Sequence, residues 1–335
     1  MGKDGTSVNH ESCMFPASCR SGTNTPMTPP AFAPDKTATW QGVLAILLWS
    51  LTLGLSRSLI ERVGPLTAAV AVYLVAGGVS LARLAARGRI RRPYEPGGAW
   101  RFLLCGALFV GYMLALYLAV GGAVSREQAL EVGLLNYLWP VLTLLGTVLF
   151  LGKKARGVRL AVGTVLALAG IMLTLAPSGA VPFADAARAP LVPVLGLAAA
   201  VAWAAYSILV RRFAEGSDPE WDTTGAGAVA WYLVAVALTL LVPALLADEP
   251  RVFSLAALAE IALLGLSTSV AYAFWERSMA HGRVTVVVAF SYLTPLLSTL
   301  FSAAYLAVLP PASLQLGCVL LIAGSITSWS SVSEK

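Results

Sequence analysis

Two short stretches place hydrogen-bonding and aromatic side chains beside a proline, deep inside long apolar segments. The first runs from Asn136 to Thr143 (NYLWPVLT), within a region that carries no charge from Val132 to Gly152. The second (SYLTPLLS) starts at Ser291, and both prolines hold the same place in their motifs. Amides, hydroxyls and rings in an uncharged setting are suited to binding a polar solute, and they do not form an acid–base or metal site.

The composition indicates the environment in which these stretches must fold. The chain has 335 residues, is 58% hydrophobic and only 12% charged, and has a mean hydropathy of +0.77. Soluble domains carry about 25% charged residues. Half that density, with repeated uncharged runs of about 20 residues, predicts an all-α membrane protein with many spans. The net charge of +6 does not indicate nucleic acid binding, because lysine and arginine lie between apolar spans.

Ten apolar segments are long enough to be transmembrane helices. Their expected limits are Thr39–Ile60, Pro65–Leu84, Ala99–Val120, Glu127–Leu151, Val158–Ala176, Leu191–Val210, Thr224–Ala247, Leu255–Ala280, Val284–Leu309 and Ala312–Trp329. Most of the 23 lysine and arginine residues fall on one side of this arrangement. Positive charge stays on the cytoplasmic side of a membrane, so both termini are expected in the cytoplasm.

Matching residues divide the ten spans into two repeats of five. Trp49 corresponds to Trp203, and the Gly163–Gly170 segment corresponds to Gly317–Gly324 at the same offset of 154 residues (317 minus 163). Because five is odd, the second repeat should enter the membrane upside down, as in many secondary transporters. The small residues in the later spans allow helix backbones to approach closely.

The repeat fixes the expected domain boundaries. Residues 1–37 are polar and are expected to form a disordered cytoplasmic tail. The first five-helix repeat covers 38–177, a linker covers 178–190, and the second repeat covers 191–330. Residues 331–335 form a cytoplasmic C-terminus. The sequence leaves the oligomeric state open, with a monomer as the working expectation.

Prolines at matching positions of two repeats have a functional interpretation. A proline within a helix removes one backbone hydrogen bond and clashes with the preceding turn. Paired interruptions of this kind are the best pointer in a sequence to the binding site of a transporter. We therefore predict that Pro140 and Pro295 are hinges beside a central cavity. The alternative is that each proline only kinks a packed helix.

Candidate binding residues share helical faces with these prolines or lie at the same expected depth. They are Trp49, Tyr112, Asn136, Tyr137, Trp139, Thr143, Trp203, Tyr206, Ser207, Tyr272, Ser291, Tyr292 and Thr294. Other tryptophans lie at span ends and are expected in the interfacial belt, namely Trp40, Trp100, Trp221 and Trp329.

The matched tryptophans, the paired prolines and the Ala-Gly pairs of the later spans resemble the EamA-type unit of the drug/metabolite transporter superfamily. The run from Glu131 to Pro140 is similar to aromatic amino acid exporters of bacterial inner membranes, as are the segments 203–206 and 291–295. The resemblance implies ten helices, a central cavity and outward movement of amino acids. It covers roughly residues 39 to 330.

No acidic or basic residue lies at the centre of an expected span. Glu131, Glu260 and Glu276 are the nearest, and all are expected toward helix ends, with Glu131 solvated. An uncharged cavity suits a zwitterionic amino acid as substrate. An organic cation, the rival substrate, would be expected to need a carboxylate at mid-membrane, and another small metabolite also stays open.

Other classes of membrane protein fit the sequence less well. An embedded enzyme would need acidic clusters or a His-containing constellation within the spans. The two histidines, His10 and His281, lie in the tail and in a loop, and no Walker-type loop is present. The spacing of the four cysteines indicates neither a metal site nor a disulfide framework, so we expect no cofactor. A scaffold that does not transport is disfavoured by the inverted repeat.

Overall fold

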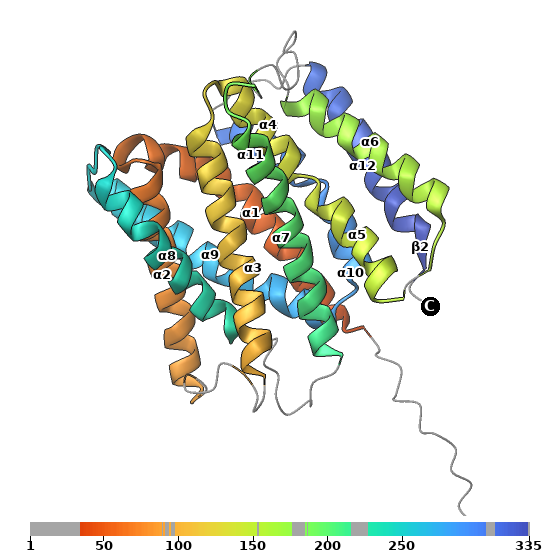
Figure 1. Ribbon diagram of the computed structural model, residues 1–335, viewed down its shortest axis with the longest axis horizontal. Coiled ribbons are helices and arrows are strands. Elements are labelled where there is room, and N and C mark those ends of the chain that lie inside the picture. Colours follow the sequence, from red (N-terminus) through yellow and green to blue (C-terminus); the bar gives the residue numbers. More distant parts are fainter. Residues whose placement is uncertain are drawn as a thin grey trace, which may run out of the picture. The chain divides into compact units, whose positions relative to one another are not determined.

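The computed structural model describes residues 34–88, 90, 94, 98–152, 154–175, 185, 187–215, 227–305 and 312–333, and within these ranges the chain is almost entirely helical (Figure 1). The helices are α1 Lys36–Val63, α2 Pro65–Ala86, α3 Ala99–Gly122, α4 Arg126–Asn136, α5 Trp139–Phe150, α6 Gly157–Leu175, α7 Leu191–Ala214, α8 Ala228–Leu246, α9 Leu255–His281, α10 Val284–Ser291, α11 Thr294–Tyr305 and α12 Ala312–Ser331. Two short strands, β1 Lys154–Ala155 and β2 Val332–Ser333, pair antiparallel.

Each of the ten expected spans contains a helix in the described residues, and the fourth and ninth spans contain two each. Five helices are long and apolar enough to cross a membrane, namely α2, α3, α7, α8 and α9. Helix α5 and parts of α6 and α12 are shorter apolar helices. The chain is therefore a multi-pass helical membrane protein. Of the predicted tail and spans, residues 1–33, 176, 224–226 and 306–309 lie outside the described part of the chain.

The expected end of the disordered tail is wrong by two residues. Helix α1 begins at Lys36, because the Asp35 side chain accepts a hydrogen bond from the Thr37 N–H at 2.8 Å. A side-chain cap of this kind satisfies one of the N–H groups that the first turn leaves without a partner. Tryptophans expected in the interfacial belt at Trp40, Trp100 and Trp329 are exposed, and Trp221 lies outside the described residues.

The two prolines do not lie in the middle of continuous helices, as the sequence had suggested. Helix α4 ends at Asn136 and α5 begins at Trp139, so Pro140 occupies the first turn of a new helix. Pro295 occupies the same position in α11. A first-turn residue has no N–H partner within its own helix, so proline is tolerated there. Both spans are interrupted two residues before the proline.

The last helices of the two repeats, α6 and α12, cross through small residues, as predicted, and lie side by side in Figure 1. A Cβ atom added to Gly170 would lie 2.8 Å from the Gly317 carbonyl oxygen, and one added to Gly163 would lie 2.9 Å from that of Gly324. Residue numbers rise along α6 as they fall along α12, so the two helices are antiparallel. Opposite directions for corresponding helices agree with an inverted repeat.

The packing between the other helices is also symmetric between the two repeats: a contact made by one helix recurs for its counterpart in the other repeat. Helix α1 packs on α9, and its counterpart α7 packs on α3. Helices α4 and α5 pack on α7, as α10 and α11 pack on α1. The pairs α2–α8 and α6–α12 each join counterparts. Exchanging the two halves therefore maps this set of contacts onto itself.

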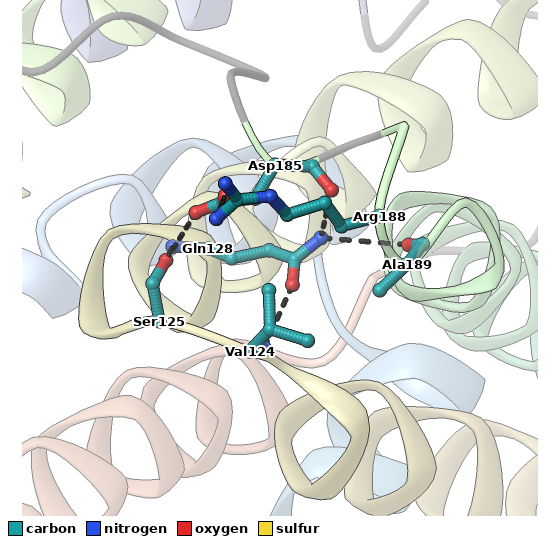
Figure 2. Close-up of polar contacts among 6 residues, drawn as sticks. All are labelled: Val124, Ser125, Gln128, Asp185, Arg188 and Ala189. Carbon is teal, nitrogen blue, oxygen red and sulfur yellow. Dashed lines mark hydrogen bonds and ion pairs between the residues drawn. The ribbon is translucent and has the colours of Figure 1, made fainter.

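A polar cluster fixes the start of α4 (Figure 2). The Ser125 hydroxyl donates to Asp185 at 2.7 Å and also caps α4. The Gln128 side chain is buried, accepts a hydrogen bond from the Val124 N–H and donates to the carbonyls of Asp185 and Ala189. Because α4 is held at this end, its other end at Asn136 has a defined position.

Candidate functional site

Six of the predicted binding residues meet in one cluster of aromatic rings. They are Trp49 of α1, Tyr112 of α3, Trp139 of α5, Trp203 and Tyr206 of α7, and Tyr272 of α9. Trp203 contacts the other five, with centroid distances from 4.9 Å to Tyr112 up to 6.3 Å to Trp139. Ring pairs contribute about 0.5–1.5 kcal/mol each beyond burial, so the cluster also ties helices of both repeats together.

Three further rings contact this cluster and were not among the predicted residues: Tyr232, which lies 6.4 Å from Tyr206, and the rings of Phe109 and Trp275. Phe109 contacts Tyr206 at 5.4 Å and Tyr272 at 5.1 Å, and Trp275 lies 5.7 Å from Trp203 in a stacked arrangement. Both are fully buried. Helical spacing could have revealed them, because Phe109 lies three residues before Tyr112 and Trp275 three residues after Tyr272.

A cavity of about 180 Å³ adjoins the rings of Trp49 and Tyr272. Hydroxyl groups of Ser56, Tyr117 and Thr268 contribute to its lining, together with aliphatic side chains of α1, α2 and α9. Among the described residues that line it, none carries a charge. The cavity is smaller than the roughly 300–1,000 Å³ that drug-sized ligands occupy, so it suits a small neutral solute.

The break between α4 and α5 brings acceptor groups to the rings. Asn136 is half-buried, and its amide lies within hydrogen-bonding reach of the Tyr112 hydroxyl. Its Oδ1 atom is buried and accepts no hydrogen bond from the described residues. The backbone donor that would normally reach the Asn136 carbonyl belongs to Pro140, which has none. Tyr137 is half-buried and packs against the same core.

The break between α10 and α11 is closed by its own side chains. The Thr294 hydroxyl donates to the Ser291 carbonyl at 2.7 Å, and the Ser291 hydroxyl donates to the Val288 carbonyl at 2.6 Å. Tyr292 is fully buried, and no ring contact joins it to the aromatic cluster among the described residues. The structure therefore places Ser291 and Tyr292 in the core and leaves Thr294 half-buried, at a break that is closed by its own hydrogen bonds.

Two other predicted residues are also buried. The Thr143 hydroxyl donates back to the Trp139 carbonyl at 2.7 Å, and the Ser207 hydroxyl accepts a hydrogen bond from the Trp275 indole at 3.3 Å. The second bond orients the Trp275 ring, because a buried indole N–H needs an acceptor. Thr143 therefore contacts the backbone of one cluster residue, and Ser207 contacts the side chain of another.

The expectation that Glu131 is solvated is wrong, and a second carboxylate near a span end, that of Glu276, is also buried. Glu131 is buried because α4 packs against α7, and Glu276 is only 2% exposed. The Tyr206 hydroxyl donates a long hydrogen bond of 3.5 Å to Glu276 Oε1. Glu260 lies at the other end of α9, where it accepts a hydrogen bond from Ser58 at 2.9 Å and pairs with Arg62 at 3.8 Å.

Comparison with known proteins identifies the family. The EamA-like transporter family model matches residues 37–176 and again 191–329, which together cover both repeats. Proteins named aromatic amino acid exporter YddG are similar to this chain, at 33% identity in Salmonella typhimurium and 32% in Escherichia coli. Each alignment covers 87% of this chain and 96% of the relative.

A third relative of the same name, from Ancylobacter novellus, is 32% identical over 86% of this chain and 95% of its own length. A solved crystal structure is similar with a TM-score of 0.72 and 28% identity, over 87% of this chain and 96% of the other. Two family matches, one on each repeat, agree with the reciprocal packing of the helices. This multi-pass membrane protein belongs to the EamA-like transporter family.

Proposed function

We propose that this protein is a secondary exporter of neutral amino acids, aromatic ones above all, across the bacterial inner membrane. The observation that carries the proposal is the α4–α5 break, where the Asn136 Oδ1 atom, which accepts no hydrogen bond from the described residues, lies beside the Trp203 ring cluster through Tyr112. An amino acid has an ammonium group that needs acceptors and, in the aromatic case, a ring that needs ring contacts. The two sets of groups lie together here.

The ends of the two half-helices complement a zwitterion. At such a break the last carbonyls of α4 carry partial negative charge and the first N–H groups of α5 carry partial positive charge. Broken helices of transporters use these ends to hold oppositely charged parts of a substrate. In our proposal the substrate ammonium donates to Asn136, and its carboxylate lies toward the start of α5.

The lining of the cavity supports a neutral substrate over an organic cation. None of its described residues is charged, whereas a permanent cation would favour a carboxylate in direct contact. The names of the relatives support aromatic amino acids. Thr143, Ser207, Ser291, Tyr292 and Thr294 then serve to hold the backbone and rings in place, and the direct contacts come from the first repeat and the cluster.

Movement is proposed to follow the repeat. Alternating access requires one half of the protein to move against the other around a fixed site. The breaks before Pro140 and Pro295 are the proposed hinges, within five-helix repeats at 38–177 and 191–330. The proposed topology has ten spans and cytoplasmic termini. Cysteines placed in the 87–96 loop should then resist impermeant thiol reagents in intact cells, and cysteines placed at 180–185 should react.

Counterflow in liposomes tests the function directly. Purified protein should exchange labelled tryptophan for unlabelled tryptophan faster than empty liposomes, and a panel of all amino acids should rank aromatic ones first. Trp203→Phe should keep the ring contacts and retain part of this activity, whereas Trp203→Ala should lose it while still reaching the membrane. Absence of counterflow with every amino acid would refute the proposal.

A further inference from the structure

Glu276 is a carboxyl group inside a spanning helix and has no role in the function proposed above. Helix α9 is long and apolar enough to cross a membrane, and Glu276 is 2% exposed within it. Ionised side chains are costly inside a membrane and commonly mark an ion or proton pathway. The group therefore calls for a functional explanation based on its contacts.

The contacts of Glu276 lead directly to the aromatic cluster. Tyr206 donates its hydroxyl to Glu276 Oε1 at 3.5 Å, and the Tyr206 ring lies 5.4 Å from Trp203 and 5.4 Å from Phe109. Next to this pair, Trp275 donates to Ser207 at 3.3 Å. Two neighbouring side-chain pairs thus join α7 to α9 behind the proposed binding site.

Titratable and charged groups approach this region from several helices. They are Cys105 of α3, Tyr206 and Arg211 of α7, Tyr232 of α8, Tyr73 of α2, and Tyr272, Arg277 and His281 of α9 itself. The Arg211 guanidinium donates to the carbonyls of Ala280 and Gly282 and pairs with Glu215 at 2.9 Å, and Arg277 pairs with Asp35 at 3.9 Å. Among these groups, Tyr206 contacts both the Glu276 carboxylate and the Trp203 ring.

We propose that Glu276 binds and releases one proton in each transport cycle, so that outward movement of the amino acid is exchanged for inward movement of a proton. The proposal rests on the exporter function above. The ionised carboxylate accepts the Tyr206 hydrogen bond and holds that ring. Protonation removes the charge that holds it, which frees Tyr206 to move relative to Trp203. Proton and substrate thereby act on the same rings.

Glu260 provides a matched control on the same helix. Its carboxylate contacts Ser58 and Arg62 near the start of α9. Glu276 and its contact with Tyr206 lie near the other end of the same helix. Glu276→Gln and Glu260→Gln make the same chemical change, so a difference between them reports position. The glutamine keeps the shape of the side chain and can still accept a hydrogen bond from Tyr206, which favours folding. Glu276→Asp, which keeps a carboxyl group, serves as a second variant.

The experiment uses full-length protein in liposomes that hold tryptophan and a pH-sensitive dye, with the membrane potential clamped by potassium and valinomycin. Efflux of tryptophan through the wild type should acidify the lumen, and one pH unit should sustain up to about a tenfold tryptophan gradient for one-to-one exchange. Glu276→Gln should abolish acidification while tryptophan counterflow stays within about twofold. Glu260→Gln should match the wild type in both, and Glu276→Asp should retain acidification.

Several results would overturn the proposal. Wild-type counterflow without acidification would show that export is not coupled to protons. Acidification that persists in Glu276→Gln would show that another group carries the proton. The same conclusion would follow if acidification vanished in Glu131→Gln alone. If no counterflow occurs, the exporter function itself fails, and a substrate-free measurement then decides the role of Glu276. Intrinsic tryptophan fluorescence should change with pH in the wild type and not in Glu276→Gln, because Trp203 and Trp275 flank the pair. Identical pH curves would reject the assignment.

Discussion

The two broken helices share a sequence pattern but present different groups at the break. In the second repeat, the Thr294 hydroxyl donates a hydrogen bond to the Ser291 carbonyl, so this carbonyl is satisfied within the break itself. In the first repeat, the residue directly before the proline is Trp139 in place of Thr294, and Trp139 has no hydroxyl to donate. The carbonyl of Asn136 is therefore left for another donor, and the Trp139 ring joins the cluster instead.

This difference shows how a repeat can keep its architecture and still divide its roles. Both breaks put a proline in the first turn of a new helix, so the backbone is equivalent. One change of side chain, from a hydroxyl to an indole, alters which groups are satisfied. We infer that the first break contacts substrate and that the second break mainly serves movement.

The largest expected effect comes from removing the free acceptor. Asn136→Leu should weaken tryptophan binding by about tenfold or more, because a hydrogen bond to a charged group contributes about 1.5–3 kcal/mol. The thermal midpoint should fall only slightly, because Oδ1 accepts no hydrogen bond from the described residues and only the contact of the amide with the Tyr112 hydroxyl is lost. Calorimetry and thermal unfolding on the same preparation measure both quantities.

Ser291→Ala is the matched control in the second repeat. It removes a hydroxyl that donates to a carbonyl of its own helix, that of Val288, so binding should stay within about twofold while stability falls by roughly 1 kcal/mol. In the reversed outcome, Ser291→Ala would abolish binding and Asn136→Leu would not. That result would show that the substrate contacts the second repeat, which contradicts the proposed division of roles.

The prolines should respond unequally. Pro140→Ala supplies a backbone N–H for the Asn136 carbonyl, so both binding and turnover should fall, by about fivefold for a bond of ~1 kcal/mol. Pro295→Ala supplies an N–H to a carbonyl that Thr294 already satisfies. Binding should therefore survive, and turnover alone should fall if this break is a hinge.

Calorimetry for binding and liposome flux per folded molecule separate these outcomes. Flux that is unchanged in both variants would eliminate the hinge hypothesis. Lower stability with unchanged flux would instead indicate that each break is needed only for packing.

The α6–α12 crossing tests a place where the two repeats should contribute equally, because glycines of both helices make equivalent close contacts. Gly170→Ala and Gly324→Ala would each place a Cβ atom against backbone. The Cβ at position 170 would lie 2.8 Å from the Gly317 oxygen, and the Cβ at position 324 would lie 2.7 Å from the Gly163 oxygen. Each should cost about 1–3 kcal/mol, by similar amounts. Gly78→Ala, where no atom lies within 4 Å, should be neutral or stabilising. Strongly unequal losses in thermal unfolding would show that the crossing is not symmetric.

The smallest expected effect concerns helix α2 and its counterpart α8. Glu249, in the loop after α8, accepts hydrogen bonds from the Leu66 and Thr67 N–H groups, both at 2.8 Å. Gly227, the residue before α8, provides no side-chain cap. Slight burial raises the pKa of the Glu249 carboxyl, but the hydrogen bonds from Thr67 and Leu66 and the charge of Arg251 outweigh it, so its pKa lies below the ordinary value.

A lowered folded pKa means that this cap stabilises the protein at neutral pH and is lost as the pH falls through the folded pKa. Glu249→Gln should therefore cost about 1 kcal/mol at pH 7 and should reduce the loss of stability between neutral and acidic pH. Asp248→Asn, a change at the exposed neighbouring position, is the control. Parallel unfolding curves for wild type and Glu249→Gln at every pH would contradict the cap.

Much of the architecture is present in the sequence because it depends on local patterns. Uncharged runs mark the helices, and the offset between Trp49 and Trp203 marks the repeat. Glycines at Gly170 and Gly324 mark the crossing, since small residues are needed wherever two backbones approach. The prolines mark the two breaks to within two residues, although not the separation of each span into two helices.

What the sequence could not decide is which neighbour each helical face meets. Periodicity distinguishes one face of a helix from another, but α9 is surrounded by other helices, so its pattern gave no reason to bury Glu276. The same limit applies to the breaks, where similar motifs predicted the same role for both. Only the packing of α4 and α5 against α7 brought Asn136 and Trp139 to the rings, while Tyr292 was enclosed in the core. Such contacts join residues far apart in the chain, and local residue patterns do not encode them.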